Sequence, residues 1–437
     1  MTRPLWAKAG SDADAQSGDK SDAMSFMSRD DVLLDRELFE HDIRATRAHV
    51  RGLASIDLLT RSDAEALDHA LADLAEDYKA GGFVLDTSYE DGHTAIESYL
   101  VGRVGETGKR VHLGRSRNDQ VAVALRLYML DALDRVKAAL IASARAALSL
   151  ARAEERTPMP GYTHLQRAVP STVGLWMGSF AESFADAAEL CVLTRRWIDS
   201  CPLGTAAGYG VNVPLPREQV AEELGFARVQ INPMSAQASR GRIEAQVVSV
   251  LWQAMQEVRR LAWDLSLFST EEFGFVTLGP GFVTGSSIMP NKKNPDMAEL
   301  LRGSAAVVGG ALAEIQQVVS LPSGYHRDLQ LTKPPLIRVV KVTLEALWHI
   351  PRLIETCTLH PERMKAAIDR AMLATDRAVE LSTGGLPFRD AYRQAAAEIG
   401  DATEIADAGA SIDARVSLGG CANLGLDQIE ARLRTLG

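Results

Sequence analysis

The stretch GPGFVTGSSIMPNKKNPD, residues 279–296, gathers hydroxyl, ammonium and amide side chains between glycines and prolines. Glycine leaves the backbone unconstrained, and the prolines exclude a helix through the middle. Ordering a long loop costs entropy, so such a loop is usually either functional or disordered. Asn294, Pro295 and Asp296 have a structural explanation as an N-cap, a first helical proline and an acidic first turn. The Gly-Ser-Ser and Lys-Lys runs have none, which makes this loop a candidate for function.

A second polar cluster, HLGRSRNDQ, spans residues 112–120 and precedes a long apolar run. Ser116 and Asp119 have the spacing of a capping box, which satisfies the first amides of a helix. The box leaves three side chains unexplained: Arg115, Arg117 and Asn118. Cations at a helix N-terminus are mildly unfavourable unless an anion joins them. The cluster therefore predicts anion binding.

A third cluster, MPGYTHLQRAVP, spans residues 159–170 and connects two predicted helices. Thr163, His164 and Gln166 lie on a proline-flanked turn. A single histidine in such a linker is more often structural than catalytic, so the residues alone leave both interpretations open.

Long helices must position these clusters. Residues 118–157 contain neither glycine nor proline, and their apolar residues recur at three- and four-residue steps, which indicates a helix of up to ~60 Å. The same reasoning predicts four more long helices: Ser171–Ser200, Arg242–Glu272, Pro295–Leu321 and Pro335–Cys357, the last kinked near Pro351. Helices of this length that are apolar on more than one face predict an elongated all-α bundle that buries surface against other copies of the chain.

Shorter helical segments flank the bundle. We expect a helical N-terminal domain over residues 1–111, with a loosely held polar arm at about residues 1–25. A central long-helix domain covers residues 112–362, and a small helical domain covers residues 363–437.

Composition excludes several classes of partner. The 437 residues carry 57 acidic and 47 basic side chains, a formal charge of -10, which argues against nucleic acid or an anionic membrane. The four scattered cysteines favour free thiols in a reducing cytosol. No secretory signal pattern and no apolar run of ~20 residues occurs. We expect a soluble cytoplasmic protein.

Two other motif matches, to a phosphate loop and to a zinc site, are incomplete. The run GETGKR resembles a phosphate loop but lacks its upstream glycine. His93 and Glu97 lie one helical turn apart, but a zinc site would need a third ligand. We therefore expect no metal.

Together the three clusters resemble the fumarase/aspartase superfamily. The loop meets all five fixed positions of the signature Gly-Ser-x-x-Met-x-x-Lys-x-Asn: Gly285, Ser286, Met289, Lys292 and Asn294. The runs GRSRNDQ and PGYTHLQRA resemble the argininosuccinate lyase branch in particular, as do LPSGYHRDLQLTK and TDRAVELSTGGLPFRDA. The likeness extends over nearly the whole chain.

This resemblance implies a three-domain all-α subunit whose central five-helix bundles form the multi-helix core of a homotetramer. Each active site would be built from three subunits. The implied reaction splits argininosuccinate into arginine and fumarate without a cofactor.

The resemblance also assigns roles. Ser286 matches the proton acceptor, His164 the second acid/base residue and Glu299 its carboxylate partner. Lys292 and Asn294 match groups that stabilise developing negative charge. Eight further residues match or adjoin substrate-binding positions: Asp35, Ser116, Arg117, Asn118, Thr163, Tyr325, Gln330 and Lys333. Since the substrate carries three carboxylates, Arg117 and Lys333 make physical sense as its cationic partners.

The sequence departs from the family pattern at a few positions. Asn291 replaces a common glutamine, Leu331 and Thr332 replace an acidic pair, and Asp31 stands where the family often has serine. An added carboxylate would repel a polyanionic substrate. A lyase acting on a related N-succinyl amine is therefore an alternative, and a catalytically silent structural protein on the same scaffold is another.

Overall fold

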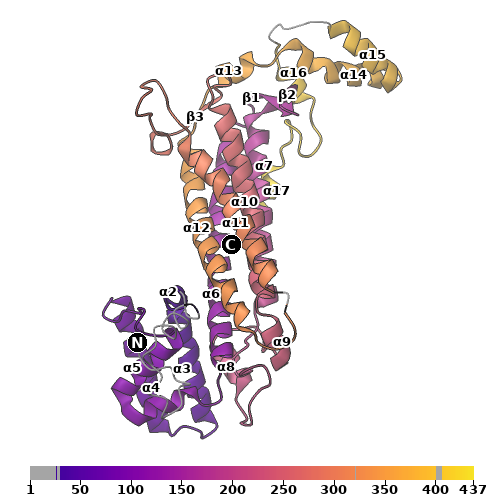
Figure 1. Cartoon of the computed structure of the whole chain (residues 1–437). Helices are drawn as coiled ribbons and strands as arrows, with labels where there is room; N and C mark the ends of the chain where they lie inside the picture. Colours follow the sequence, from indigo (N-terminus) through magenta and orange to yellow (C-terminus); the bar gives the residue numbers. More distant parts are fainter. Residues whose placement is uncertain (1–25, 27–29, 320, 400–405) are drawn as a thin grey trace. The chain divides into compact units, whose positions relative to one another are not determined.

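The protein is mainly helical in the computed structural model, which describes residues 26, 30–319, 321–399 and 406–437 (Figure 1). The predicted polar arm, residues 1–25, lies outside the described residues. The short helices of the N-terminal region are α2 (Asp31–Leu34), η2 (Asp35–Glu37), α3 (Phe39–Ser55), α4 (Arg61–Lys79), α5 (Gly92–Val104) and η3 (Gly105–His112).

The five long helices predicted from periodicity are confirmed. They are α6 (Arg117–Ala153), α7 (Val173–Ile198), α10 (Arg242–Phe268), α11 (Asp296–Val318) and α12 (Lys333–Glu355). Pro351 lies inside α12, and a kink there stays a prediction. Between α7 and α10 lie α8 (Arg217–Glu223) and α9 (Pro233–Ala238). The all-α fold class is therefore confirmed.

The connection between α6 and α7 is a β-hairpin, which the sequence analysis described only as a turn. Strand β1 (Pro158–Thr163) pairs antiparallel with β2 (Gln166–Thr172), leaving His164 and Leu165 as a two-residue loop. Both loop residues have positive φ, 55° and 59°. This backbone is typical of a type I′ turn, whose twist suits a hairpin. A second short pair joins β3 (Val276–Thr277) to β4 (Thr358–Leu359).

The remaining described elements lie within the loop at 279–296 or after α11. They are η4 (Pro280–Phe282), η5 (Arg327–Thr332), α13 (Pro361–Ala366), η6 (Arg370–Leu373), α14 (Ala374–Thr383), α15 (Phe388–Ile399), α16 (Gly409–Asp413) and α17 (Leu426–Leu436). In the described residues, no helix combines the length and the apolar character needed to cross a membrane.

The chain divides into two compact units. The first comprises Met1–Asp134, Leu193–Ser249 and Gly310–Val340, and the second comprises Arg135–Val192, Val250–Gly309 and Lys341–Gly437. The three predicted domains, residues 1–111, 112–362 and 363–437, stay a prediction.

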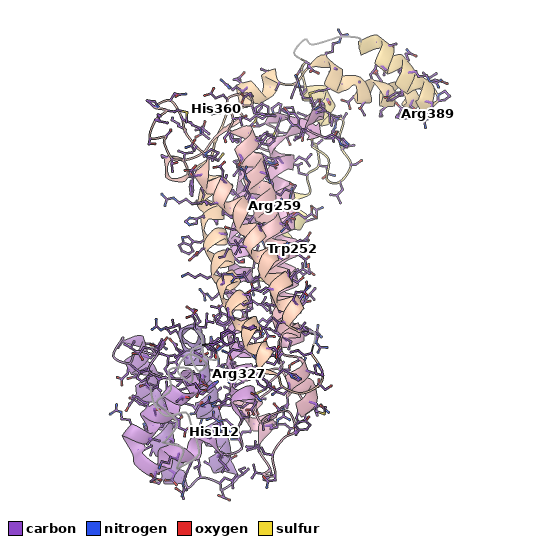
Figure 2. All side chains as sticks on the ribbon, viewed as in Figure 1. His112, Trp252, Arg259, Arg327, His360 and Arg389 are labelled. Carbon is purple, nitrogen blue, oxygen red and sulfur yellow. The ribbon has the colours of Figure 1, made fainter. Side chains whose placement is uncertain are left out.

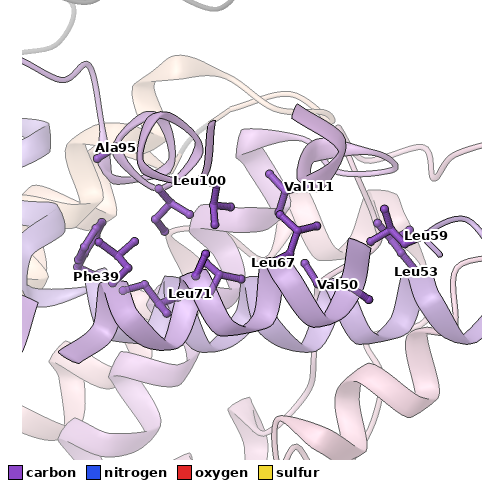
Figure 3. Packing of buried hydrophobic residues seen from close by; sticks show 14 of the residues in the cluster. Phe39, Val50, Leu53, Leu59, Leu67, Leu71, Ala95, Leu100 and Val111 are labelled. Atoms are coloured by element: carbon purple, nitrogen blue, oxygen red, sulfur yellow. The ribbon is translucent and has the colours of Figure 1, made fainter. Parts of the chain in front are cut away.

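The first unit contains an apolar core between α3, α4 and α5 (Figure 3). Leu67, Leu71 and Leu74 recur at four- and three-residue steps along α4, so they share one face and are fully buried. They pack in one cluster with Leu53 of α3 and Leu100 of α5. Burying five such side chains stabilises the unit by roughly 1.5–3 kcal/mol each. This core fixes the start of α5, where several site residues lie.

In the second unit, aromatic side chains hold α7 against α10. Trp176 meets Phe268 edge-on with ring centroids 5.3 Å apart, and its indole donates to Asp264 at 2.9 Å. The guanidinium of Arg302 on α11 lies 4.1 Å from the ring centroid of Trp263 on α10. These contacts join α7 and α11 to the C-terminal part of α10, and the three helices lie side by side in this unit (Figure 1).

Candidate active site

The predicted capping box at the start of α6 is present, except that the Ser116 hydroxyl binds the amide of Asn118 and not that of Asp119. The Ser116 backbone amide donates to Asp119 Oδ1 at 2.9 Å, and the Ser116 hydroxyl accepts from the Asn118 amide at 3.3 Å. Asp119 Oδ2 also accepts from the amides of Gly204 and Ala206, each at 2.9 Å. Asp119 therefore ties the helix start to the 204–206 loop and has a structural role.

Arg115, which the sequence analysis grouped with the anion-binding residues, is used inside the protein. Its side chain is buried, Nη1 donates to Thr46 Oγ1 at 2.9 Å and Nη2 donates to the Val111 carbonyl at 3.0 Å. Burial lowers the pKa of this guanidinium. Protein oxygens thus bind both terminal nitrogens of Arg115, and anion binding at this residue stays a prediction.

Arg117 points to a different set of partners. Its Nη1 lies 2.9 Å from Glu90 Oε1 and 3.2 Å from Asp91 Oδ2, and its Nη2 donates to Thr94 Oγ1 at 3.2 Å. Burial acts to lower the pKa of Arg117, but the charges of Asp91 and Glu90 outweigh it and raise the pKa. Arg117 is therefore fixed as a cation at the start of α5.

Lys333 is fully buried at the first residue of α12, where two prolines follow it. Proline is favourable in the first turn because its missing N–H has no partner there. The Lys333 ammonium lies 2.6 Å from Asp35 Oδ1 and 2.7 Å from Asp31 Oδ1. Burial alone would lower the pKa of Lys333, but both carboxylates raise it. Lys333 is thus a buried cation shared by two acids, one of them the unexpected Asp31.

His93 carries a further positive charge, on a side chain that is 11% exposed. Its Nδ1 lies 2.5 Å from Asp42 Oδ2. Burial acts to lower the pKa of His93, whereas the charges of Asp42, Asp91 and Asp35 raise it to about 9. The imidazole is therefore protonated at neutral pH. His93 is also one of the two residues, with Glu97, that have the spacing of zinc ligands, and its Nδ1 is paired with Asp42.

These groups surround one cavity of about 180 Å³ in the first unit. Its lining mixes acids, cations and hydrogen-bonding groups: Asp31, Asp35, Glu90, Asp91, His93, Arg117, Asn118, Val121, Arg240, Tyr325, Arg327, Gln330 and Lys333. Arg327, labelled in Figure 2, reaches it from η5. Of the eight predicted substrate-binding residues, six line this cavity: Asp35, Arg117, Asn118, Tyr325, Gln330 and Lys333.

The signature loop belongs to the second unit and is closed by a backbone bridge. The amides of Thr284 and Asn294 donate to each other's carbonyls at 3.1 and 2.8 Å. Inside it, the Ser286 hydroxyl accepts from the Met289 amide at 3.0 Å. The side chain of Asn294 donates to the Gly285 carbonyl at 3.4 Å, and α11 begins at Asp296. Asn294 therefore closes the loop instead of capping the helix as predicted.

Four of the predicted residues in the second unit lie on its surface. Lys292 is exposed on the loop, Thr163 and His164 are exposed at the hairpin tip, and Glu299 is exposed on α11. The Glu299 carboxylate accepts from Arg302 on its own helix at 3.4 Å. Within the described residues of one chain, no hydrogen bond joins His164 to Glu299.

The structure thus brings six of the eight substrate-binding predictions together and leaves Thr163 and the proton-transfer predictions on separate segments of the second unit. Sequence reasoning singled out none of five further cavity residues: Glu90, Asp91, Val121, Arg240 and Arg327. The run YEDGH carried a usable signal for Asp91, since Asp followed by Gly and Thr at N3 suits an N-cap, and Asp91 Oδ1 accepts from the Thr94 amide at 2.7 Å. Arg240 had no sequence signal.

Comparison with known proteins defines the class. The family described as lyase matches residues 16–310. The crystal structure of EDDS lyase in complex with formate superimposes with a TM-score of 0.80, at 24% identity, over 94% of this chain and 90% of that one. The fold is thus that of a helical lyase, as the resemblance to the fumarase/aspartase superfamily implied.

Two relatives refine the class. Argininosuccinate lyase of Sorangium cellulosum (strain So ce56) is 54% identical over 433 residues, 99% of each chain. Argininosuccinate lyase of Xylella fastidiosa (strain 9a5c) is 49% identical over 436 residues, all of this chain and 97% of the relative. The chain belongs to the argininosuccinate lyase family.

Proposed function

We propose that this protein cleaves argininosuccinate to arginine and fumarate, without a cofactor. The observation that carries the proposal is the identity of about half of all residues, along the whole chain, with relatives named for this activity. The uninterrupted signature from Gly285 to Asn294 supports it, because an elimination needs those groups and a structural protein would not.

The chemical difficulty of the reaction is electrostatic. A base must remove a proton from a carbon beside a carboxylate, which places a second negative charge on that group. Ser286 is the proposed base, and Lys292 and Asn294 are the proposed stabilisers of the new charge. Fixed donors of this kind are each worth about 3–4 kcal/mol when removed singly. A serine hydroxyl is a weak base, so it needs nearby cations and shielding from water.

The second proton transfer is assigned to His164, with Glu299 as its carboxylate partner. A carboxylate beside an imidazole favours the imidazolium, which can protonate the departing guanidinium nitrogen. His164 is held by a hairpin turn with two left-handed residues, a backbone that non-glycine residues adopt at some energetic cost. This strain at an exposed histidine supports a functional position for it.

Substrate binding is assigned to the cavity of the first unit. It is lined by Asp35, Arg117, Asn118, Tyr325, Gln330 and Lys333, and Asp35 Oδ1 lies 2.6 Å from the Lys333 ammonium. Ser116 and Thr163 complete the proposed set from the cap of α6 and from the hairpin.

We further propose a cytoplasmic homotetramer with shared active sites. In one chain Trp348 is 80% exposed and Trp263 is 52% exposed on long helices of the second unit. Large apolar side chains in such positions favour burial against other copies. Shared sites would also bring the exposed loop and hairpin to the cavity of a neighbouring copy.

The proposed function is tested by mixing purified protein with argininosuccinate and following fumarate by its ultraviolet absorbance. We expect turnover at a rate typical of metabolic enzymes, ~1–1,000 per second. Fumarate release from another N-succinyl amine, but not from argininosuccinate, would overturn the substrate assignment. No release from either would overturn the assignment as a lyase.

A further inference from the structure

The hairpin that carries His164 has a turn that needs support from the residues around it. His164 and Leu165 both have positive φ, 55° and 59°. Non-glycine residues keep such a backbone only where the surrounding structure holds them in place. The contacts at the base of this turn therefore determine where the His164 imidazole lies.

The first anchor of the hairpin is aromatic. Tyr162 and Arg167 face each other across the two strands, one residue pair away from the turn. Residues that face each other in this way have their side chains on the same face of the ribbon. The Tyr162 ring packs against Phe268 and Phe273, with ring centroids 6.3 and 5.6 Å apart. Strand β1 is thus anchored at the C-terminal end of α10.

The second anchor is an ion pair between β2 and the C-terminal segment. Arg167 Nη1 lies 2.8 Å from Asp369 Oδ2 and donates to the Ala367 carbonyl at 3.3 Å. Asp369 directly precedes η6, where its Oδ1 accepts from the Met372 amide at 3.2 Å. This capping bond fixes the Asp369 carboxylate and leaves Oδ2 for Arg167. The C-terminal segment therefore holds the strand that follows the turn.

Packing leaves room beside the hairpin. Helices α13 and α16 contact the strands, but a hollow of about 750 Å³ separates the hairpin from α14 and from residues 414–421 (Figure 1). Thr163 and Val169 line it on the hairpin side, and Val379 and Glu380 line it on the side of α14. The hollow gives the ribbon space to tilt. The ion pair of Arg167 opposes that movement.

Exposure separates a structural from a positioning role for this ion pair. The side chain of Arg167 is 50% exposed and that of Asp369 is 18% exposed. Ion pairs that water reaches to this extent contribute little to the stability of a fold. The position of a reacting group matters far more, because a displacement of ~1 Å can slow a reaction ~100-fold. Loss of the pair should therefore leave the fold intact and misplace His164.

We propose that Arg167 and Asp369 are positioning residues, whose ion pair fixes the hairpin so that His164 reaches the departing nitrogen of the substrate. The C-terminal segment thereby takes part in the reaction by acting through His164. The inference rests on the proposed function, since it takes His164 as the acid that protonates this nitrogen.

Steady-state kinetics of fumarate release on full-length variants test the proposal. Arg167→Gln should lower kcat between ~10- and ~100-fold, while KM stays within ~2-fold and the thermal midpoint is unchanged. Arg167→Lys should keep kcat within ~3-fold of wild type, because Nη1 makes both contacts and an ammonium can replace a single nitrogen. Arg377→Gln is the matched control, since it removes a cation of the C-terminal segment that pairs with Glu380 and Glu398.

The partner carboxylate provides a second variant. Asp369→Asn keeps an oxygen for the Met372 amide and removes the charge that Arg167 binds. The double variant Arg167→Gln/Asp369→Asn should have a kcat within ~2-fold of the slower single variant, because both changes break the same contact. Losses that multiply in the double variant would show that the two residues act separately, contrary to the proposal.

Hydrogen exchange followed by mass spectrometry tests the positioning without turnover. In Arg167→Gln the amides of residues 158–172 should exchange at least ~3-fold faster than in the wild-type protein, with no change over α10. Unchanged exchange in the hairpin would overturn the inference, as would faster exchange with a wild-type kcat. A wild-type protein that releases no fumarate would instead overturn the proposed function, so the two failures are distinguishable.

Discussion

The two regions that carry the predicted site residues have opposite characters. The cavity of the first unit is lined by buried ionic groups that hold one another, such as Lys333 with Asp31 and Asp35. The signature loop and the hairpin of the second unit present Lys292 and His164 on the surface. The region proposed for recognition is already organised by ion pairs, whereas the groups proposed for proton transfer lie open to water in one chain.

From this difference we infer that the cavity provides substrate binding and that the loop and the hairpin provide proton transfer. A charge network fixed by protein ion pairs needs little rearrangement to bind substrate, so it favours specificity. A serine base gains reactivity only when cations and water exclusion reach it together. Changes in the loop should therefore affect turnover, and changes in the cavity should affect binding or stability.

The largest expected effect is in the loop. Ser286→Ala should lower kcat at least ~100-fold without altering the thermal midpoint, because it removes only the proposed base. Steady-state assays of fumarate release measure this. Ser287→Ala, the exposed neighbour, is the control and should keep kcat within a few-fold of wild type. Equal kcat values for the two variants would remove Ser286 from the mechanism.

The next effect concerns the stability of the cavity wall. His93 has a folded pKa of about 9 against an ordinary value of 6.5. The charged His93 therefore contributes to the free energy of unfolding. This contribution is fully present below about pH 6.5 and is lost as pH rises through about 9, a change of about 3 kcal/mol. The thermal midpoint should fall over this range in the wild-type protein.

In Asp42→Asn that fall should become much smaller, because the carboxylate that raises the His93 pKa most is gone and only the weaker charges of Asp91 and Asp35 remain. His69→Gln, at an exposed histidine, is the control and should keep the wild-type pH profile. A wild-type midpoint independent of pH between 6.5 and 9 would contradict the pairing of a charged His93.

A smaller effect distinguishes two arginines that lie two residues apart. Arg117→Gln should raise KM about 10-fold, since it removes a charged group from the cavity. Arg115→Gln should leave KM nearly unchanged and lower the thermal midpoint, because it leaves Thr46 and Val111 without a partner. Steady-state kinetics and thermal melts on both variants decide between them. A KM effect for Arg115→Gln would support its predicted role in anion binding.

The smallest expected effect is at Asp31. Asp31→Ser introduces the residue that the family often has here, and it should free part of the Lys333 charge for the substrate. We expect KM for argininosuccinate to fall about 2- to 5-fold. Asp30→Ser, at an exposed neighbour, is the control. A higher KM in Asp31→Ser would show that Asp31 binds substrate itself.

Local sequence patterns predicted the fold well where one physical signal dominated. The stretch that forms α6 contains no helix breaker until Pro158, so periodicity placed the helix within a few residues of Arg117–Ala153. The hairpin was missed because three prolines interrupt its strands and its turn is His-Leu, without the Asn-Gly or Asp-Gly signal of a type I′ turn.

The sequence predicted six residues that line the cavity, but it did not predict which side chains form ion pairs with one another. Lys333 and Asp35 are 298 positions apart in sequence, so no local pattern could show their ion pair. Arg115 and Arg117 are the same residue type at the same helix start, and only the fold directs one into the core and the other to the cavity. Arg240 lies outside every motif, and only its buried, unbonded nitrogens draw attention to it.

The proposed division of roles requires that the signature loop and the hairpin of some copies meet the cavity of another copy in one active site. Mixing the inactive variants Ser286→Ala and His164→Asn tests this directly, after exchange of chains between them is verified by mass. About one quarter of the wild-type fumarate release should return, since half of the loops and half of the hairpins are intact and they combine independently. Complete inactivity of the exchanged mixture would contradict sites shared between copies.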